Sequence, residues 1–339
     1  MELTEIQSPF FTSKDLETDQ EVRWCPGCGD YAILKSVQNV LPELGVPKHQ
    51  FVFISGIGCS SRFPYYMDTY GMHSIHGRAA AIATGVKLAN PELSVWMITG
   101  DGDSLSIGGN HLIHTLRRNP DINILLFNNE IYGLTKGQFS PTSHVGQITK
   151  SSPMGVADSP FNPLALALGA GSTFVARTMD RDLKHQQLMY KRAYFHKGTS
   201  LVEIYQNCNV FNDGAFDVFT AKGSKPETTL FLTHGQPLVF AEGTKGIMLQ
   251  GLTPVIVELD KVNKDDLWIH DEKDLTKAHL LSQFFDKEHF PRPFGVIYAI
   301  ENKPVFNEVM KQQIVDSKIE NKQLAFSKLL KSSSSWEIK

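Results

Sequence analysis

Apolar residues recur at two distinct spacings along the first half of the chain. Between Asp30 and Gly45 they return at every third or fourth position, which predicts a helix with Asp30 as its N-cap and Gly45 as its stop. Residues 51–58, FVFISGIG, predict a buried strand that runs into a glycine turn. The small residues of 77–90 predict a helix that packs closely against a sheet.

A pattern of strand, loop, helix and strand follows directly. Residues 93–100 and 122–129 are typical of buried strands, and 111–119 is typical of the helix between them. Such crossovers are right-handed in nearly all proteins, and they bring the carboxyl ends of both strands to one edge of a parallel sheet. Because ligands of α/β folds bind at that edge, we expect an α/β fold with its site there.

The pattern continues to about Thr220 and then changes. After a polar loop at 130–152 the spacing predicts helix 162–170, strand 172–177, helix 181–195 and strand 200–208. Beyond this point short strands and turns alternate, with a helix from about Leu275 to Phe285. We therefore expect an α/β domain over 1–220 and a smaller C-terminal α+β extension over 221–339, which we expect to form a subunit interface.

Composition excludes several classes of function. The chain has 33 Lys and Arg against 36 Asp and Glu, so its net charge of −3 offers no excess positive potential to a nucleic-acid backbone. No segment has the run of apolar residues that a membrane span needs, and the first residues are acidic where a signal peptide is basic. We expect a cytoplasmic protein that binds neither nucleic acid nor membrane.

Polar residues follow the two strands of the crossover. Asp101 lies in the Gly100-Asp101-Gly102 turn after the first strand, and Asn129 ends the second. Mg²⁺ prefers hard oxygen ligands and often shares them with substrate phosphates. Asp101, Asn129 and the backbone carbonyl of Ile131 would supply half of its shell, while the glycines let backbone N–H groups approach a diphosphate.

The cysteines leave three interpretations open. The chain has only four, Cys25, Cys28, Cys59 and Cys208, and the first two form the C-x-x-C of WCPGC. Such a pair can be a thiol–disulfide couple, half of a zinc site or half of an iron–sulfur site. The order differs from the W-C-G-P-C of thioredoxin-like proteins, and the second short-range pair that is usual in zinc sites is missing.

Together these motifs resemble a known family. The stretches WCPGCG, GIGCSSR, GDGDSLSIGGNHLIHTLRRN and NNEIYGLTKGQFSPTS are similar to the β subunits of the 2-oxoacid:ferredoxin oxidoreductases. WCPGCG is most similar to the 2-oxoglutarate branch. The resemblance runs from about Val22 to Cys208 and more weakly beyond, and it implies a thiamine-diphosphate-binding fold with a parallel sheet flanked by helices.

The resemblance also implies the site. It assigns Cys25, Cys28, Cys59 and Cys208 to one [4Fe-4S] cluster near the thiamine diphosphate. It assigns these residues to the cofactor and its Mg²⁺: Gly56, Ile57, Gly58, Cys59, Ser60, His76, Gly100, Asp101, Gly102, Asp103, Asn129, Ile131, Gly133, Leu134 and Thr135. Arg62 is a candidate for gripping the distal carboxylate of 2-oxoglutarate, and His76 for donating a hydrogen bond to diphosphate or substrate.

The implied reaction converts 2-oxoglutarate and coenzyme A to succinyl-CoA and CO₂, with electrons passing to ferredoxin, or runs in reverse. In this family an α subunit supplies the pyrimidine-binding domain and its Glu, which implies an (αβ)₂ heteromer. Pyruvate or a branched-chain 2-oxo acid as substrate remains an alternative. A non-redox thiamine enzyme and a bare electron-transfer subunit are more distant ones.

Overall fold

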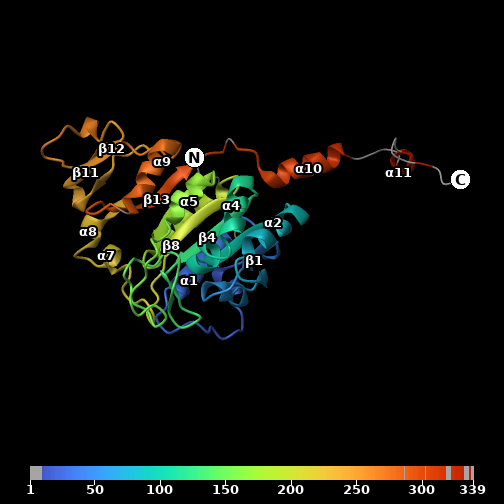
Figure 1. Cartoon of the computed structure of the whole chain (residues 1–339), viewed down its shortest axis with the longest axis horizontal. Coiled ribbons are helices and arrows are strands. Elements are labelled where there is room, and N and C mark those ends of the chain that lie inside the picture. The colour runs from blue at the N-terminus through green and yellow to red at the C-terminus, as the bar shows by residue number, and fades with distance from the viewer. Residues whose placement is uncertain (1–9, 286, 302, 318–321, 332–335, 337–339) are drawn as a thin grey trace.

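The strands that carry the motifs lie in the middle of one sheet (Figure 1). The computed structural model describes residues 10–285, 287–301, 303–317, 322–331 and 336. The strand order of this sheet is β2 (Tyr70–His73), β1 (Phe51–Ser55), β3 (Ser94–Gly100), β4 (Ile122–Asn128), β8 (Ser200–Tyr205), β7 (Phe174–Met179), β13 (Arg292–Ala299) and β9 (Thr229–Phe231). All neighbours pair in parallel except β13 with β7.

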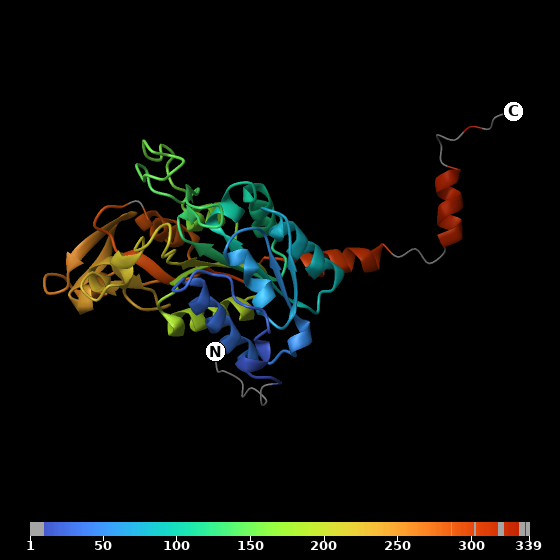
Figure 2. The same cartoon turned by 90° about the horizontal axis from the view of Figure 1, so that it is seen from below.

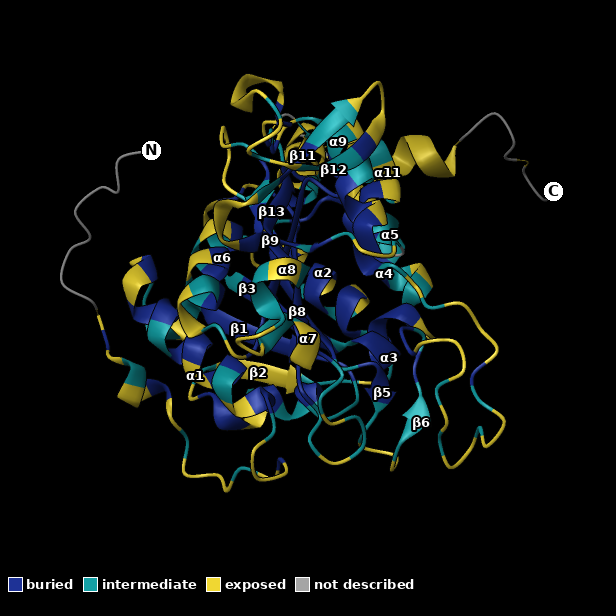
Figure 3. Cartoon of the chain, turned by 90° about the vertical axis from the view of Figure 1, so that its left-hand side faces the viewer, coloured by how far each residue is buried: buried dark blue, intermediate teal, exposed yellow. Residues whose placement is uncertain are grey.

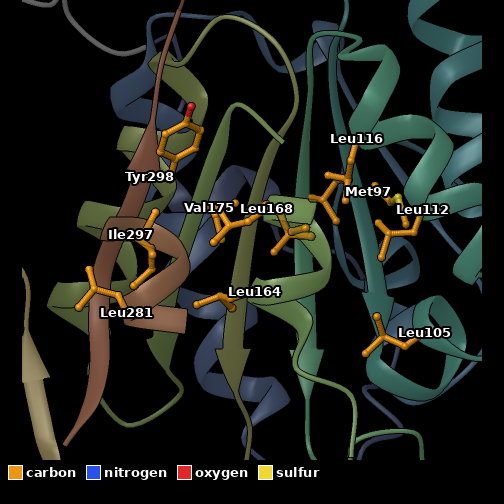
Figure 4. Close-up of a cluster of buried hydrophobic side chains, with 14 of the residues drawn as sticks. Met97, Leu105, Leu112, Leu116, Leu164, Leu168, Val175, Leu281, Ile297 and Tyr298 are labelled. Carbon is orange, nitrogen blue, oxygen red and sulfur yellow. The ribbon is translucent and has the colours of Figure 1, made fainter. Parts of the chain in front are cut away.

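Helices cover both faces of this sheet, as the alternation of apolar helices and strands predicts. One face packs against α1 (Asp30–Val40) and α6 (Leu183–Phe195). The other packs against α2 (Ala79–Ala89), α4 (Gly109–Arg118), α5 (Pro163–Gly169) and α9 (Leu275–Ser282). Figure 4 shows the second layer, in which Met97 of β3 meets Leu112 and Leu116 of α4. Figure 3 shows the strands between the layers as buried.

Shorter elements complete the described part of the chain. Those at the carboxyl edge of the main sheet are α3 (Asp101–Leu105), β5 (Ile131–Tyr132) and β6 (Gln138–Phe139). The 3₁₀ helices are Ser13–Leu16, Leu41–Leu44, Lys48–Gln50, Ser60–Tyr66, Ala241–Gly243, Lys264–Asp266 and Gln283–Phe285. The segment between β6 and α5 projects from the body as a long loop, drawn in green in Figure 2.

The helix after the C-x-x-C begins differently from the prediction. Gly29, not Asp30, occupies the N-cap position, and no side chain caps the helix. The Asp30 carboxylate is buried, and neither of its oxygens has a hydrogen-bond partner among the described residues. The prediction of Asp30 as N-cap was therefore wrong, because the side chain turns into the protein. Gly45 does end the segment, with a left-handed φ of 69°.

The residues after 220 contribute to the main sheet as well as forming separate elements. β9 and β13 extend it beyond β7, while β10 (Val239–Phe240), β11 (Lys245–Gln250) and β12 (Thr253–Glu258) form a second, antiparallel sheet. The further helices of the described part are α7 (Asp217–Thr220), just before this region, and α8 (Lys225–Thr228), α10 (Phe306–Asp316) and α11 (Lys322–Leu330) within it; α10 extends away from the body in Figure 1. A boundary at residue 220 stays a prediction.

In the described part of the chain, none of the helices combines the length and the apolar character needed to cross a lipid bilayer.

Candidate functional site

Asp101 and Asn129 follow neighbouring strands, as the sequence predicts. β3 and β4 pair in parallel with Gly100 opposite Phe127, so Asp101 at the start of α3 and Asn129 after β4 leave the same edge of the sheet. The segment after β6 returns to this edge. The Thr142 hydroxyl oxygen lies 2.6 Å from Asp101 Oδ2 and 2.9 Å from Asn128 Oδ1, so the loop is fastened to both strand ends.

The Asp101 carboxyl is suited to a bound cation. Its side chain is buried, and burial raises the pKa of Asp101 to about 6, which hydrogen bonds from Ser140, Thr142 and Gly102 oppose and the nearby Glu130 reinforces. A buried carboxylate is costly without a positive partner. A divalent cation at Asp101 would remove that cost, so the chemistry of this side chain fits the metal that the sequence predicts.

Both polar atoms of the Asn129 side-chain amide are hydrogen-bonded. Its Oδ1 accepts the backbone N–H of Ile131 at 3.2 Å, and its Nδ2 donates to Gln206 Oε1 at 2.8 Å. Glu130 between them has a left-handed φ of 57°, which makes the tight turn at the end of β4. This turn brings Asn129 and Ile131 together beside Asp101, and all three offer oxygen atoms of the kind that Mg²⁺ prefers.

Asp103 organises the loops around the motif. Its Oδ1 accepts from the backbone N–H of Ile57 at 3.0 Å and of Gly77 at 2.7 Å, and its Oδ2 accepts from Thr99 Oγ1 at 2.8 Å. A Cβ at Gly56 would lie 1.9 Å from Oδ2, so only glycine fits there. The carboxylate thus joins the GIG turn after β1 to the loop before α2, and it acts on the cofactor loops rather than presenting a free oxygen.

His76 has one ring nitrogen engaged. Its Nδ1 lies 2.7 Å from Asp103 Oδ1, and because the carboxylate only accepts, Nδ1 carries the proton. The ring is partly exposed, and its Nε2 has no hydrogen-bond partner among the described residues. His73 differs, since its Nδ1 contacts the Tyr65 hydroxyl at 3.1 Å and burial lowers its pKa. Nε2 of His73 also lacks a hydrogen-bond partner among the described residues, but it is buried, whereas the His76 ring is partly exposed.

Arg62 lies beside the cysteine turn in the 3₁₀ helix Ser60–Tyr66. It is partly buried, and no hydrogen bond or ion pair joins its guanidinium to another residue in the described ranges. Burial raises the pKa of Cys59 and the positive charge of Arg62 opposes that rise, whereas at His73 burial lowers the pKa and the charge of Arg62 adds to the lowering. An arginine that is half-buried and without a carboxylate partner leaves its fork of donors available to an anion.

Tyr132 is a site residue that sequence reasoning missed. Its hydroxyl donates to the carbonyl of Gly102 at 2.8 Å, and a Cβ at Gly102 would lie 2.3 Å from its ring. Gly102 is therefore required by this ring as well as by backbone approach to a ligand. Leu134 and Thr135 are exposed in the turn that follows. The alternating polar character of this segment gave no signal that Tyr132 packs on the motif.

The cysteines converge on the same turn. A Cβ at Gly133 would lie 3.4 Å from Cys59 Sγ and 3.6 Å from Cys208 Sγ, although the two cysteines are far apart in the sequence. Cys28 and Cys25 are joined by a turn with a 3.0 Å hydrogen bond from the Cys28 N–H to the Cys25 carbonyl. All four thiols are free of disulfides. Three segments that each carry cysteine thus meet beside the end of β4.

Burial favours the protonated form of two of these thiols, Cys28 and Cys59. Burial raises the pKa of Cys59 to about 12, and burial also raises that of Cys28, with Asp30, Cys59 and Cys208 adding to the shift. A thioredoxin-type nucleophile needs the opposite shift. Thiolates here need a cationic partner such as iron.

The donor set of four thiols is the one that a [4Fe-4S] cluster takes. Within residues 10–285 and the further described ranges, no three His, Cys, Asp or Glu side chains are grouped closely enough to hold a metal ion. A cubane cluster binds each thiolate through a different iron, so its ligands are spread more widely than around zinc.

Comparisons with known proteins agree on thiamine-dependent 2-oxoacid oxidoreductases. A family model described as the thiamine pyrophosphate enzyme C-terminal TPP binding domain matches residues 56–204. The chain is 52% identical over 305 residues to the 2-oxoglutarate oxidoreductase subunit KorB of Mycobacterium tuberculosis, covering 89% of this chain and 81% of that one. It is 46% identical over 199 residues to the 2-oxoacid:ferredoxin oxidoreductase 1 subunit beta of Aeropyrum pernix, covering 59% and 61% of the two.

A solved structure is similar over nearly the whole chain. The 2-oxoglutarate:ferredoxin oxidoreductase from Magnetococcus marinus, with 2-oxoglutarate, coenzyme A and succinyl-CoA bound, matches with a TM-score of 0.77 and 31% sequence identity. The match covers 97% of this chain and 98% of that one. The likeness therefore includes the extension after residue 220 as well as the region that the thiamine model matches.

Proposed function

Because the chain belongs to the β subunits of the 2-oxoacid:ferredoxin oxidoreductases, we propose that it oxidatively decarboxylates 2-oxoglutarate with coenzyme A, giving succinyl-CoA and CO₂. Electrons leave through a [4Fe-4S] cluster to ferredoxin, and the reaction can run in reverse. The observation that supports this most directly is the position of Gly133, which lies against Cys59 and Cys208 and follows the Asn129 turn by four residues in the sequence.

Thiamine diphosphate binds with Mg²⁺ at the edge of β3 and β4. Asp101, Asn129 and the Ile131 carbonyl would hold the metal, and the Gly100–Gly102 turn would bind the diphosphate. When bound, the cofactor supplies a nucleophilic carbon and an electron sink for decarboxylation of a 2-oxo acid. The protein keeps the metal ligands in place through Thr142 on Asp101 and Gln206 on Asn129.

The four cysteines hold the cluster next to that cofactor. Cys59 lies in the turn after β1 whose neighbour Ile57 is fixed by Asp103, the same carboxylate that fixes His76. One acidic side chain therefore sets the position of a cluster segment relative to the pocket. When bound, a cluster would supply one-electron acceptance, which thiamine enzymes that simply protonate the decarboxylated substrate lack.

Arg62 and His76 contact the substrate or the diphosphate. Arg62 has donors without a partner in the described part of the chain, and a planar guanidinium matches a carboxylate in a bidentate pair. 2-Oxoglutarate has a second carboxylate and pyruvate does not. We assign Arg62 to that group and His76, through Nε2, to an oxygen of diphosphate or substrate.

An α subunit completes the site, as the β-subunit names of the relatives imply. It supplies the pyrimidine-binding domain with its Glu, and two αβ pairs form the assembly. Residues 221–339 brace the interface: exposed apolar residues on α10 and α11 are Val309, Ile314, Val315, Leu324, Phe326, Leu329 and Leu330. Because β9 and β13 belong to the main sheet, only deletion from residue 306 onward tests this without breaking the sheet.

A cytoplasmic location stays a prediction from the sequence.

The test is a substrate comparison on the complex purified without oxygen. The chain is co-expressed with its α subunit and assayed for ferredoxin reduction with 2-oxoglutarate, pyruvate and a branched-chain 2-oxo acid, each with coenzyme A. We expect the highest kcat/KM for 2-oxoglutarate and succinyl-CoA as its product. A preference for pyruvate would move the assignment to a sister enzyme, and a complex that decarboxylates without reducing ferredoxin would overturn the oxidoreductase assignment.

A further inference from the structure

The side chain of Gln206 connects the diphosphate motif to a cysteine. It lies just after β8 and is only 1% exposed. Its Oε1 accepts from Asn129 Nδ2 at 2.8 Å, and its Nε2 lies 3.3 Å from Cys28 Sγ. One amide group thus contacts both a residue that we assign to the metal and a residue that we assign to the cluster.

The directions of these hydrogen bonds are fixed by the backbone. Gln206 Nε2 is 2.6 Å from the carbonyl oxygen of Asn207, which can only accept, so the nitrogen faces that side and Oε1 faces Asn129. At the other end, Asn129 Oδ1 faces the N–H of Ile131, which can only donate. A flipped amide at either position would bring two acceptors or two donors together. The hydrogen bonds therefore all point the same way: Asn129 donates to Gln206, and Gln206 donates to Cys28.

The position of Gln206 is itself fixed by its surroundings. Its backbone N–H donates to the carbonyl of Asn128 at 2.9 Å, which continues the pairing of β8 with β4. The next residue, Asn207, donates its N–H to Asp180 Oδ2 at 2.7 Å and accepts from the N–H of Gly29 at 3.2 Å. The backbone that carries the Gln206 side chain is therefore fixed at the sheet edge, next to Cys28.

We infer that Gln206 is a positioning residue that couples the metal-diphosphate site to the iron–sulfur cluster. The inference rests on the function proposed above and adds a role for a residue outside both ligand sets. Toward the metal, Gln206 Oε1 accepts a hydrogen bond from the side-chain Nδ2 of Asn129. This contact keeps Oδ1 of Asn129 turned to the metal side. Toward the cluster, it donates a hydrogen bond to the sulfur of Cys28.

Each contact has a measurable effect. Hydrogen bonds to the sulfurs of a cluster favour its reduced, more negative state and raise its reduction potential. A cation on Asn129 Oδ1 polarises that amide, which strengthens its hydrogen bond to Gln206 and in turn the bond from Gln206 to Cys28. Binding of Mg²⁺ and thiamine diphosphate should therefore raise the potential of the cluster, so that the electron acceptor is tuned when the cofactor is in place.

The test uses two variants that lack the amide, Gln206→Met and Gln206→Leu, in the complex with the α subunit. The matched control is Gln186→Met, since Gln186 is also buried and also donates through Nε2 to backbone carbonyls, of Met179 and Asp180, but is not bonded to any cysteine. The midpoint potential of the cluster is measured by redox titration with electron paramagnetic resonance, with and without Mg²⁺ and thiamine diphosphate. Mg²⁺ affinity is measured by the retention of the cofactor.

In the Gln206 variants we expect a lower midpoint potential, a smaller response of that potential to the bound cofactor, and Mg²⁺ affinity weaker by on the order of 10-fold. The Gln186 variant should match the wild type in all three. Unchanged potentials in a Gln206 variant that keeps its cluster would overturn the inference and leave the proposed function intact. The inference would also be overturned if both Gln206 variants lost the cluster while Gln186→Met kept it. Gln206 would then be needed to build the cluster site rather than to couple it to the metal site. A wild-type complex without cluster or cofactor would instead refute the proposed function.

Discussion

Thr142 Oγ1 lies 2.6 Å from Asp101 Oδ2 and fastens the loop after β6 to the residue that begins the diphosphate motif. Thr142 is fully buried although its segment is a polar loop. Its single hydroxyl hydrogen serves one acceptor at a time, and the contact with Asp101 is shorter than that with Asn128. The loop that projects in Figure 2 is therefore fastened by a hydrogen bond to Asp101, the residue that we propose as a metal ligand.

The first prediction concerns this contact. Thr142→Val keeps the shape of the side chain but removes the hydrogen bond to Asp101, so Mg²⁺-dependent binding of thiamine diphosphate should weaken by on the order of 10-fold. Isothermal titration with the cofactor at fixed Mg²⁺ measures this. Thr199→Val is the control. Thr199 is equally buried, but it lies just before β8 begins, at the opposite end of that strand from Gln206, and its hydroxyl donates to the carbonyl of Pro120. Equal cofactor affinity in the two variants would show that Thr142 has no role at the metal.

The second prediction concerns the fourth thiolate. Cys208→Ala leaves three cysteines, so the cluster should be labile or absent while thiamine diphosphate still binds. Iron and labile sulfide per chain and the visible spectrum of the anaerobic complex measure this. Val210→Ala, at an exposed position two residues along, serves as the control. An intact cluster with an unchanged reduced spectrum in Cys208→Ala would mean that the fourth ligand lies elsewhere.

The third prediction concerns substrate choice. Arg62→Met keeps the length of the stem but removes the donors, leaving the distal carboxylate of 2-oxoglutarate unpaired at a cost of roughly 2–5 kcal/mol. At about 1.4 kcal/mol per tenfold, kcat/KM for 2-oxoglutarate should fall about 30-fold or more, and that for pyruvate should change little. Steady-state assays with both acids give the ratio. Arg23→Met removes an exposed arginine that pairs with Glu21 and should leave the ratio unchanged. If Arg62→Met lowers kcat/KM for both acids by the same factor, Arg62 does not distinguish the two acids by their second carboxylate.

The fourth prediction concerns acid stability. His196 is buried against Thr173, and burial lowers its pKa to about 4, which the nearby Asp121 opposes and Arg192 reinforces. The unfolded chain, with a histidine pKa of about 6.5, binds a proton that the folded chain does not, so stability falls as the pH drops from about 6.5 towards 4. The cost approaches ~3 kcal/mol.

Chemical unfolding of wild type and His196→Gln at pH 7 and pH 4.5 measures the effect of this histidine. Glutamine preserves a polar partner for Thr173 but does not titrate. The free energy of unfolding of the variant should therefore rise relative to the wild type at the lower pH. A difference between the two proteins that does not change with pH would refute the assignment.

Sequence reasoning reached the elements whose signal is local. The β3–α4–β4 crossover, the strand ending near Cys208 and the placement of Asp101 beside Asn129 all follow from apolar periodicity and from the geometry of parallel sheets. It did not reach β13, which joins β7 antiparallel across more than a hundred residues of chain. The pairing of a strand so far away depends on tertiary packing, for which the local pattern carries no information.

Side-chain direction was the second limit. Asp30 has the residue type and position of an N-cap, yet its carboxylate points into the protein beside Cys28. Gln206 and Thr142 lie in segments that predict only a strand end and a polar loop, and their importance depends on which way an amide or a hydroxyl faces. The cysteines and the glycine turns were recognised because they resemble a family, while these supporting residues became visible only in the folded chain.

The central claim is that electrons from a 2-oxo acid leave through a cluster held by this chain. The direct measurement is the visible and electron paramagnetic resonance spectrum of the anaerobic complex after mixing with 2-oxoglutarate and coenzyme A, before and after oxidised ferredoxin is added. The account predicts that 2-oxoglutarate bleaches the cluster absorption, that ferredoxin restores it, and that Cys208→Ala shows neither change. Succinyl-CoA formation with a cluster spectrum that does not respond to 2-oxoglutarate would contradict it.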